Sequence, residues 1–269
     1  MSMVIEEALR HQYNEFARQY DGVDQGIDLI LARLTTAPDA SVLDVGCGTG
    51  NLTLRLAEKN ALRRVVGVDL SESALEIARN HARDRKLSAY EFIRASACSL
   101  PFRAGEFDVV VSNMVFHLIP DHRKAFAEAV RVLRPSGKAV IQFHGGGPAG
   151  AEWMEVFRQA WQEAIPDRQP PVLIPEIPIR AVEEDLVAAG VRSFDISWRH
   201  RVRRVPAAGV AKIDNFCRIV LGFWRWGLPA ETVRRIDERI TQLLLERAAG
   251  GHLVITVNVL LVEFQTPGE

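Results

Sequence analysis

The segment from Val42 to Gly50, which reads VLDVGCGTG, constrains the fold of this chain more than any other. A short apolar run ends in Asp44, and glycines then stand at positions 46, 48 and 50. Residues 51–58 follow with the apolar spacing of a helix. A strand, a glycine turn and a helix in this order are typical of an α/β sheet that brings its backbone close to a ligand. Glycine suits such a turn because the backbone angles are unusual and because a Cβ atom would hold the ligand away.

The spacing of the glycines separates two kinds of nucleotide site. A dinucleotide fingerprint has the form G-x-G-x-x-G, whereas Asn51 stands here at the third glycine position and the last glycine comes one residue early. Asp44 is also unusual beside a turn that would face an anionic pyrophosphate. A carboxylate at this position suits a ligand that carries positive charge.

The D-x-G-x-G-x-G form of the segment resembles the first motif of the class I S-adenosylmethionine-dependent methyltransferases. The cofactor of that family carries an ammonium and a sulfonium group, which agrees with an acid beside the turn. The resemblance covers roughly residues 10–145 and the closing strands. It implies that the amino-acid end of S-adenosylmethionine is surrounded by Asp44, Gly46, Cys47, Gly48 and Gly50.

A second acid, Asp69, ends the next expected strand, 64–70, and stands 19 residues beyond Gly50. In βαβ units that bind a nucleoside, an acid about 20 residues after the turn accepts hydrogen bonds from the ribose hydroxyls. Capping of the following helix is the alternative role for such an acid. The distance from the glycine turn favours the ribose.

The remaining cofactor contacts are implied by the resemblance alone. Leu70 and the pair Ser96-Ala97 are expected to flank the adenine, and Asn113 is expected to lie near the methionine side. The family usually has an aspartate where Ser96 stands, and a hydroxyl lacks the charge-assisted hydrogen bonds of a carboxylate. Many small-molecule methyltransferases begin with a helix that ends in Tyr-Asp and folds over the cofactor, which makes Tyr20 a lid candidate.

Strands and helices alternate through the first half of the chain, which predicts an α/β fold with a doubly wound, mostly parallel sheet. Together with the closing strands, the sheet is expected to have seven strands, as in the Rossmann-like methyltransferase fold. We expect a single methyltransferase domain over residues 1–269. Its parts are a helical lid at 1–34, a cofactor-binding core at 35–144, helical cap insertions at 145–178 and 206–250, and closing core elements at 179–205 and 251–269.

The two insertions are rich in aromatic residues, among them Trp153, Trp161, Phe216, Phe223, Trp224 and Trp226. Inserted aromatic helices at one end of an α/β sheet are plausible walls of a substrate cavity. Packing of the insertions onto the core is the alternative for each of these side chains. As a group they favour a covered, rather apolar pocket.

Composition and charge argue against several other classes of protein. The chain has 269 residues, 48% of them apolar and 25% charged, with a formal net charge of −1. We therefore expect no nucleic-acid or membrane partner, and we interpret the basic strand at 199–204 as a solvated sheet face. The cysteines Cys47, Cys98 and Cys217 are widely spaced and odd in number, which indicates a reduced, cytoplasmic setting. The charged residues at 1–20 argue against a signal peptide.

Two histidines stand at expected strand ends, where the ligand crevice of such a sheet lies: His117 after the fourth strand and His144 at the end of the fifth. Histidine titrates near neutral pH and is therefore a candidate general base. A base is needed only if the methyl acceptor must lose a proton, as a phenol or alcohol would. The alternative for each histidine is a hydrogen-bonded structural role, and the sequence indicates no metal site.

These patterns predict transfer of a methyl group from S-adenosylmethionine to a small, partly apolar acceptor. Methylation of a hydroxyl or carboxylate oxygen is favoured, and methylation of carbon or nitrogen is possible. Among the members of this family, the chain is most similar in general character to the quinone-biosynthesis and malonyl-carrier-protein methyltransferases. Two alternatives are kept: a nicotinamide-dependent oxidoreductase, and a non-catalytic S-adenosylmethionine-binding module, which Ser96 in place of an acid would suit. The sequence makes no prediction of the acceptor's identity or of the oligomeric state.

Overall fold

A computed structural model describes residues 26–34, 36–58, 62–144, 151–172, 177–211, 214, 222–225 and 227–268. These residues fall into two compact units. Those within 1–145, 176–198 and 260–269 form the first unit, and those within 146–175 and 199–259 form the second. The cofactor and catalytic residues predicted from the sequence lie in the first unit, except Tyr20, which lies outside the described residues.

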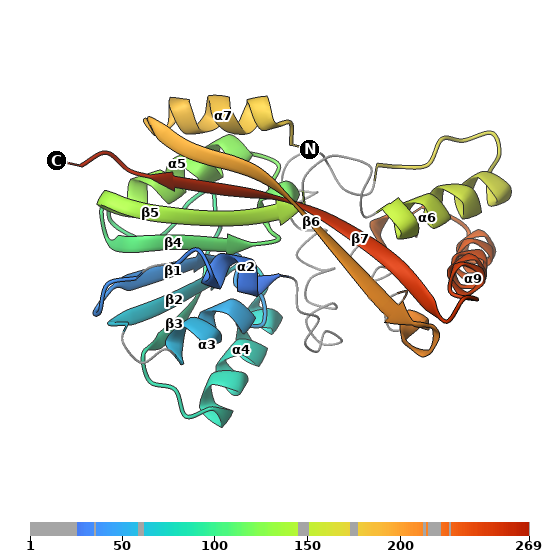
Figure 1. Cartoon of the computed structure of the whole chain (residues 1–269), viewed down its shortest axis with the longest axis horizontal. Helices are drawn as coiled ribbons and strands as arrows, with labels where there is room; N and C mark the ends of the chain where they lie inside the picture. The colour runs from blue at the N-terminus through green and yellow to red at the C-terminus, as the bar shows by residue number, and fades with distance from the viewer. Residues whose placement is uncertain are drawn as a thin grey trace. The chain divides into compact units, whose positions relative to one another are not determined.

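Seven strands of the described chain form one sheet in the order β3-β2-β1-β4-β5-β7-β6 (Figure 1). Their bounds are β1 (Ser41–Val45), β2 (Arg64–Asp69), β3 (Tyr90–Arg94), β4 (Phe107–Asn113), β5 (Leu133–His144), β6 (Ser193–Pro206) and β7 (His252–Gln265). The neighbouring strands from β3 to β5 in this order all pair in parallel. Strand β7 runs opposite to β5, as their arrows in Figure 1 show. The predicted seven-stranded, mostly parallel sheet is confirmed.

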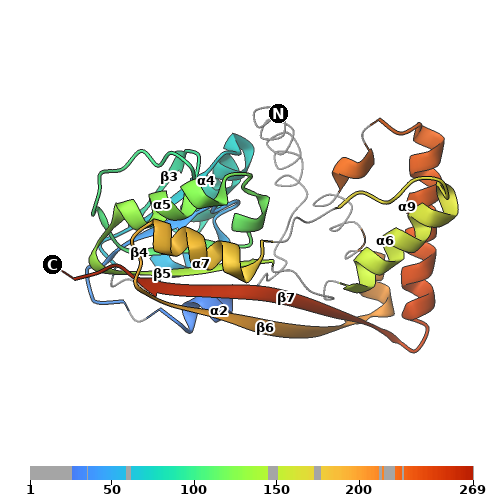
Figure 2. The same ribbon diagram turned by 90° about the horizontal axis from the view of Figure 1, so that it is seen from above.

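Helices cover both faces of the sheet in the first unit (Figure 1 and Figure 2). Their bounds are α2 (Ile27–Leu31), α3 (Asn51–Ala57), α4 (Glu72–Asp84), the short 3₁₀ helix η1 (Phe116–Leu118), α5 (His122–Val132) and α7 (Ile179–Ala188). Leu43 and Val45 of β1 belong to the apolar cluster of α5 and α7, and Val42 belongs to that of α2 and α3. Alternate residues of a strand thus serve opposite layers, as the pleat requires.

Local signals explain where several helices begin. The Ser71 hydroxyl caps α4 by accepting a hydrogen bond from the Ala74 N–H at 3.1 Å, and the Asp121 carboxylate caps α5 through the Lys124 N–H at 3.0 Å. Each cap satisfies a backbone donor that has no partner within the helix.

Two elements of the first unit have irregular beginnings. Helix α2 begins at Ile27, after Gly26 in the left-handed conformation. Strand β5 begins at Leu133, because this residue pairs with Phe107 before the register shifts. A turn-like residue inside the strand, Ser136 with φ of +59°, accompanies the shift.

The second unit has its own apolar core. It contains α6 (Ala151–Ala164), the 3₁₀ turns η2 (Ala207–Gly209) and η3 (Gly222–Arg225), α9 (Ala230–Arg247) and parts of β6 and β7. Trp153, Trp161 and Trp224 are buried in this core together with Phe157. These three tryptophans are thus buried inside the second unit, and packing within that unit accounts for them. Phe216, Trp226 and the side chain of Phe223, which belong to the cap insertion at 206–250, lie outside what the structure describes.

In the part of the chain that the structure describes, no helix has both the length and the apolar character needed to cross a bilayer.

Candidate functional site

The glycine turn at 46–50 is bonded to the end of β2. The N–H groups of Gly46 and Cys47 both donate to the carbonyl oxygen of Val68, at 2.8 and 2.9 Å. The N–H of Gly50 donates back to the Cys47 carbonyl at 3.0 Å and closes the turn before α3 begins. These bonds leave the Gly48 N–H directed at the carboxylate of Asp69, the last residue of β2.

Two glycines of the turn are required for different reasons. Gly46 has φ of +73°, and a Cβ atom there would lie 2.4 Å from Cγ2 of Val115. Gly48 has φ of +54°, but a Cβ atom there would have no protein atom within 4 Å. Gly46 is therefore needed for packing against the segment after β4, whereas Gly48 borders open space from which a ligand can approach the backbone.

Asp69 joins the glycine turn to the segment that leads into α4 through its two carboxylate oxygens. Oδ2 accepts the Gly48 N–H at 2.9 Å, and Oδ1 accepts the Ser71 N–H at 2.9 Å. Burial raises the pKa of this carboxyl, and the backbone hydrogen bonds oppose the increase. A carboxylate oxygen accepts more than one hydrogen bond, so each oxygen of Asp69 can still accept a hydroxyl of a vicinal diol.

Asp44, by contrast, is almost completely buried, with 1% of its surface exposed. Its Oδ2 accepts the Thr53 hydroxyl at 2.6 Å. Burial, and to a smaller extent the charge of Asp69, raises the pKa of Asp44 to about 7. The group is therefore balanced between its neutral and charged forms near neutral pH, and a nearby cation would shift it towards the carboxylate.

Cys47 and Leu70 complete the rim of the turn. The Cys47 thiol is buried, and burial together with the charges of Asp69 and Asp44 raises its pKa well above the ordinary value. A thiol in this state is a poor nucleophile. Leu70 is half-buried, and its carbonyl accepts the Nε–H of Arg94 at 3.3 Å.

The loop after β3 contains Ser96 and Ala97, both partly buried. Its first N–H, from Ala95, donates to the carbonyl oxygen of Asp69 at 3.1 Å. The Ser96 hydroxyl oxygen accepts the Cys98 N–H at 3.2 Å, so the hydroxyl hydrogen is available to donate. Ser96 can therefore offer a neutral hydrogen bond where the family usually has a carboxylate.

The end of β4 is linked to both the glycine turn and β5. Asn113 accepts the side-chain N–H of Gln142 at 2.9 Å, and the Met114 N–H donates to the Gln142 carbonyl at 2.7 Å. Met114 has φ of +60°, a conformation that is rare for a side chain of this size. The turn at Met114 brings Val115 against Gly46, so the segment after β4 borders the candidate cofactor site.

His117 and His144 lie together at the ends of β4 and β5. The backbone N–H of His144 donates to Nδ1 of His117 at 3.3 Å, and the ring centroids are 6.0 Å apart. Burial and the neighbouring His144 lower the pKa of His117 to about 3. Because Nδ1 accepts a hydrogen bond, the ring hydrogen lies on Nε2. His117 is therefore a neutral hydrogen-bond donor rather than a base.

Several site residues were not anticipated from the sequence. Thr53 holds Asp44, Val115 packs on Gly46, and Gln142 holds Asn113. Gln142 had a detectable signal, because it is a single amide in an otherwise apolar stretch, and it is completely buried. No sequence signal marked Thr53 or Val115, because threonine is ordinary in a helix and valine is ordinary after a strand.

Comparison with known proteins agrees with this geometry. Residues 43–141 match the model of a family described as a methyltransferase domain. A demethylmenaquinone methyltransferase of Thermus thermophilus is 36% identical over 164 residues, which is 57% of this chain and 73% of that protein. One of Lactococcus lactis is 32% identical over 150 residues, 52% of this chain and 60% of the relative. The chain thus matches only part of the length of these relatives.

Solved structures share the fold at low sequence identity. The YcgJ protein of Bacillus subtilis has a TM-score of 0.62 at 18% identity, over 90% of this chain and 98% of that one. A phosphoethanolamine N-methyltransferase of Haemonchus contortus, in complex with phosphomonomethylethanolamine and S-adenosylhomocysteine, has a TM-score of 0.57 at 20% identity, over 91% of this chain and 53% of that one. From the glycine turn, the parallel sheet and these relatives, we conclude that the chain belongs to the class I S-adenosylmethionine-dependent methyltransferases.

Proposed function

We propose that this chain transfers the methyl group of S-adenosylmethionine to a small, partly apolar acceptor that carries a hydroxyl or carboxylate group. The observation that carries the proposal is the contact between Asp69 and the Gly48 N–H, which joins a nucleoside-type acid to an open glycine turn. An acid and a turn bonded in this way place carboxylate oxygens, which accept hydrogen bonds from hydroxyl groups, beside exposed backbone at one edge of the sheet.

In this proposal the cofactor lies along the carboxyl ends of β1, β2 and β4. Asp44 and the turn at 46–50 attract the ammonium end, which agrees with a carboxyl that a cation would charge. Asp69 accepts the ribose hydroxyls. Leu70 and Ser96-Ala97 flank the adenine, and Asn113 borders the methionine side. Tyr20 stays a predicted lid residue.

Bound S-adenosylmethionine supplies an electrophilic methyl carbon and a neutral leaving group. The chain's own residues align the acceptor and exclude water from it. His117, as the neutral tautomer that carries its proton on Nε2, would donate a hydrogen bond to an oxygen of the methyl acceptor. His144, whose ring centroid lies 6.0 Å from that of His117, would take a hydroxyl proton from the acceptor.

The names of the relatives suggest a second, more specific candidate acceptor. Those described above act, by name, on demethylmenaquinone, and the reduced form of such a quinone is an apolar molecule with phenolic hydroxyls. Methylation of its ring would form a carbon–carbon bond, whereas methylation of its hydroxyl would form an ether. The two methylated products have the same mass, but proton NMR distinguishes a methyl group on carbon from one on oxygen.

The test is an incubation of the purified protein with methyl-labelled S-adenosylmethionine and chemically reduced demethylmenaquinone. Phenols and carboxylic acids of similar size serve as parallel acceptors, and Asp69→Asn serves as the impaired variant. We expect label in an extracted product with the wild type and much less with the variant. Absence of transfer to every acceptor, with binding of S-adenosylhomocysteine intact, would favour a non-catalytic binding module instead.

A further inference from the structure

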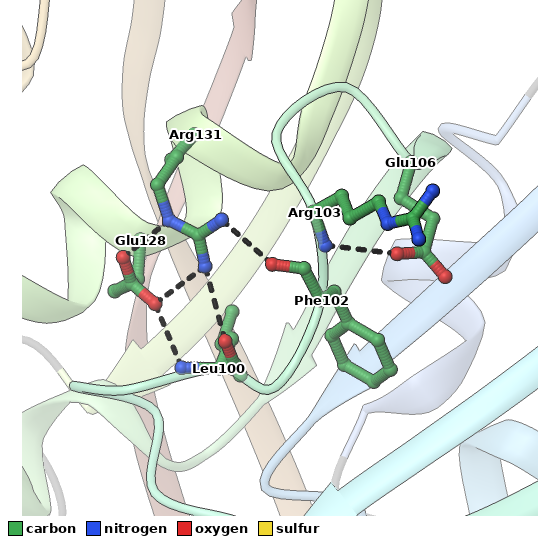
Figure 3. A network of polar contacts seen from close by, with 6 residues as sticks. All are labelled: Leu100, Phe102, Arg103, Glu106, Glu128 and Arg131. Carbon is green, nitrogen blue, oxygen red and sulfur yellow. Dashed lines mark hydrogen bonds and ion pairs between the residues drawn. The ribbon is translucent and has the colours of Figure 1, made fainter.

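Two side chains of α5, Glu128 and Arg131, bind the backbone of the loop between β3 and β4 (Figure 3). Oε2 of Glu128 accepts the Leu100 N–H at 2.7 Å. Arg131 donates from Nη2 to the Leu100 carbonyl at 3.1 Å and from Nη1 to the Phe102 carbonyl at 2.7 Å. We call Glu128 and Arg131 the loop clamp, because together they bind both polar backbone groups of Leu100.

The loop clamp is held in shape by its own ion pair. Nε of Arg131 donates to Oε1 of Glu128 at 2.6 Å, and Nη2 donates to Oε2 at 2.8 Å. The Arg131 guanidinium is the main reason that the pKa of Glu128 is lowered, and Glu128 in turn raises the pKa of Arg131. A two-point pair of this kind fixes the direction of both side chains, unlike a single contact between surface charges.

The segment that follows β3 is therefore anchored on two sides. At its start, the Ala95 N–H is bonded to the carbonyl of Asp69. At its end, Leu100 is bonded to the loop clamp. Ser96 and Ala97 lie between these anchors, and an internal turn from Ser96 to Ser99 joins them.

We propose that Glu128 and Arg131 are positioning residues that hold the backbone of residues 96–100 in the geometry that receives the adenine of the cofactor. The proposal rests on the proposed function of the site. Ser96 offers only a neutral hydrogen bond, which is weaker than the charge-assisted bond of a carboxylate. Recognition of the adenine then depends more on the shape and position of the loop, and the loop clamp sets both.

The chain offers a matched control at the other end of the same loop. Glu106 accepts the Arg103 N–H at 2.9 Å and pairs with Nη2 of Arg64 at 2.9 Å. It is also a carboxylate bound to a loop N–H and to an arginine, but it lies beyond Phe102, away from Leu100 and the loop clamp (Figure 3). Its loss removes a similar set of bonds without releasing the segment 96–100.

The experiment is a calorimetric titration with S-adenosylhomocysteine of the wild type and of Glu128→Ala, Glu128→Gln and Glu106→Ala, at a temperature at which all are folded. We expect Glu128→Ala to bind about tenfold more weakly, which corresponds to about 1.4 kcal/mol. Glu128→Gln should recover most of the affinity, because its amide oxygen can still accept the Leu100 N–H. Glu106→Ala should bind within about twofold of the wild type.

Equal affinity of Glu128→Ala and the wild type would overturn the proposal, and so would an equal loss in Glu106→Ala, since the effect would then be one of general loop stability. If Glu128→Ala does not fold, Glu128→Gln together with Arg131→Lys decides in its place: the lysine variant, which cannot reach both carbonyls, must bind more weakly than the glutamine variant. A wild type that does not bind S-adenosylhomocysteine would overturn the proposed function itself and the positioning role with it.

Discussion

Replacement of Asp44 by asparagine should make the ligand-free protein more stable at alkaline pH. The folded protein holds the Asp44 proton with a pKa of about 7, whereas the ordinary value is 3.8. The folded state therefore binds this proton more tightly than the unfolded chain. The stability that the proton contributes is complete below pH 3.8 and is lost as the pH rises towards 7.

The size of the effect follows from the two pKa values. Each unit of difference corresponds to about 1.4 kcal/mol, so the wild type should lose about 2.5 kcal/mol between pH 5 and pH 8 through this group. Asparagine does not titrate and keeps an oxygen that can accept the Thr53 hydroxyl. The stability advantage of Asp44→Asn over the wild type should therefore grow by about 2.5 kcal/mol over this range.

The assay is urea unfolding followed by circular dichroism at pH 5 and pH 8, with the exposed residue Asp195 changed to asparagine as the control. Any constant effect of the substitution cancels when the two pH values are compared. A difference between variant and wild type that does not change with pH would refute the account of Asp44. The same variant should bind S-adenosylhomocysteine more weakly, since it lacks the charge that the ammonium group attracts.

Other predictions concern the turn and the histidines. Gly48→Ala should cost about 1 to 2 kcal/mol of stability through its left-handed backbone and should lose most of its affinity for S-adenosylhomocysteine. Gly46→Ala, whose Cβ would overlap Val115, should lose more stability than Gly48→Ala. Thermal unfolding measures the stability and calorimetry the affinity, and equal losses of stability in the two variants would contradict the distinction. His117→Gln should retain most methyl transfer because its amide can replace the Nε2–H donor, whereas His144→Gln should slow methyl transfer to a hydroxyl acceptor strongly, since glutamine cannot take up a proton. A larger loss of rate in His117→Gln than in His144→Gln would reverse the two roles.

The residues proposed to hold the cofactor could be named from sequence because their pattern is local. Asp44 and the glycines are neighbours in the chain, and a βαβ unit brings the acid of its second strand beside the turn. The sequence therefore indicated Asp69 as a site residue, although its hydrogen bond from the Gly48 N–H was seen only in the structure. The fold follows from the same regular alternation of strands and helices. These features depend on backbone geometry that few residues can satisfy.

Features that depend on tertiary packing could not be predicted in the same way. Glu128 and Arg131 are an ordinary i,i+3 pair on a helix, and only the structure shows that they bind the loop after β3. His117 and His144 were equivalent as strand-end histidines until the backbone of one was found bonded to the ring of the other. Trp161 was an aromatic of uncertain role, and its burial depends on α9, which is distant in the sequence.

The central claim is that the glycine turn and Asp69 hold an S-adenosyl ligand, and thermal unfolding with added ligand tests it most directly. Ligand at about a hundred times its dissociation constant stabilises the folded state by about 2.7 kcal/mol, which raises the melting temperature of a chain of this length by several degrees, roughly 5 to 10 °C. We expect this increase with S-adenosylhomocysteine and not with NAD. An increase with NAD alone, or with neither ligand, would contradict the account.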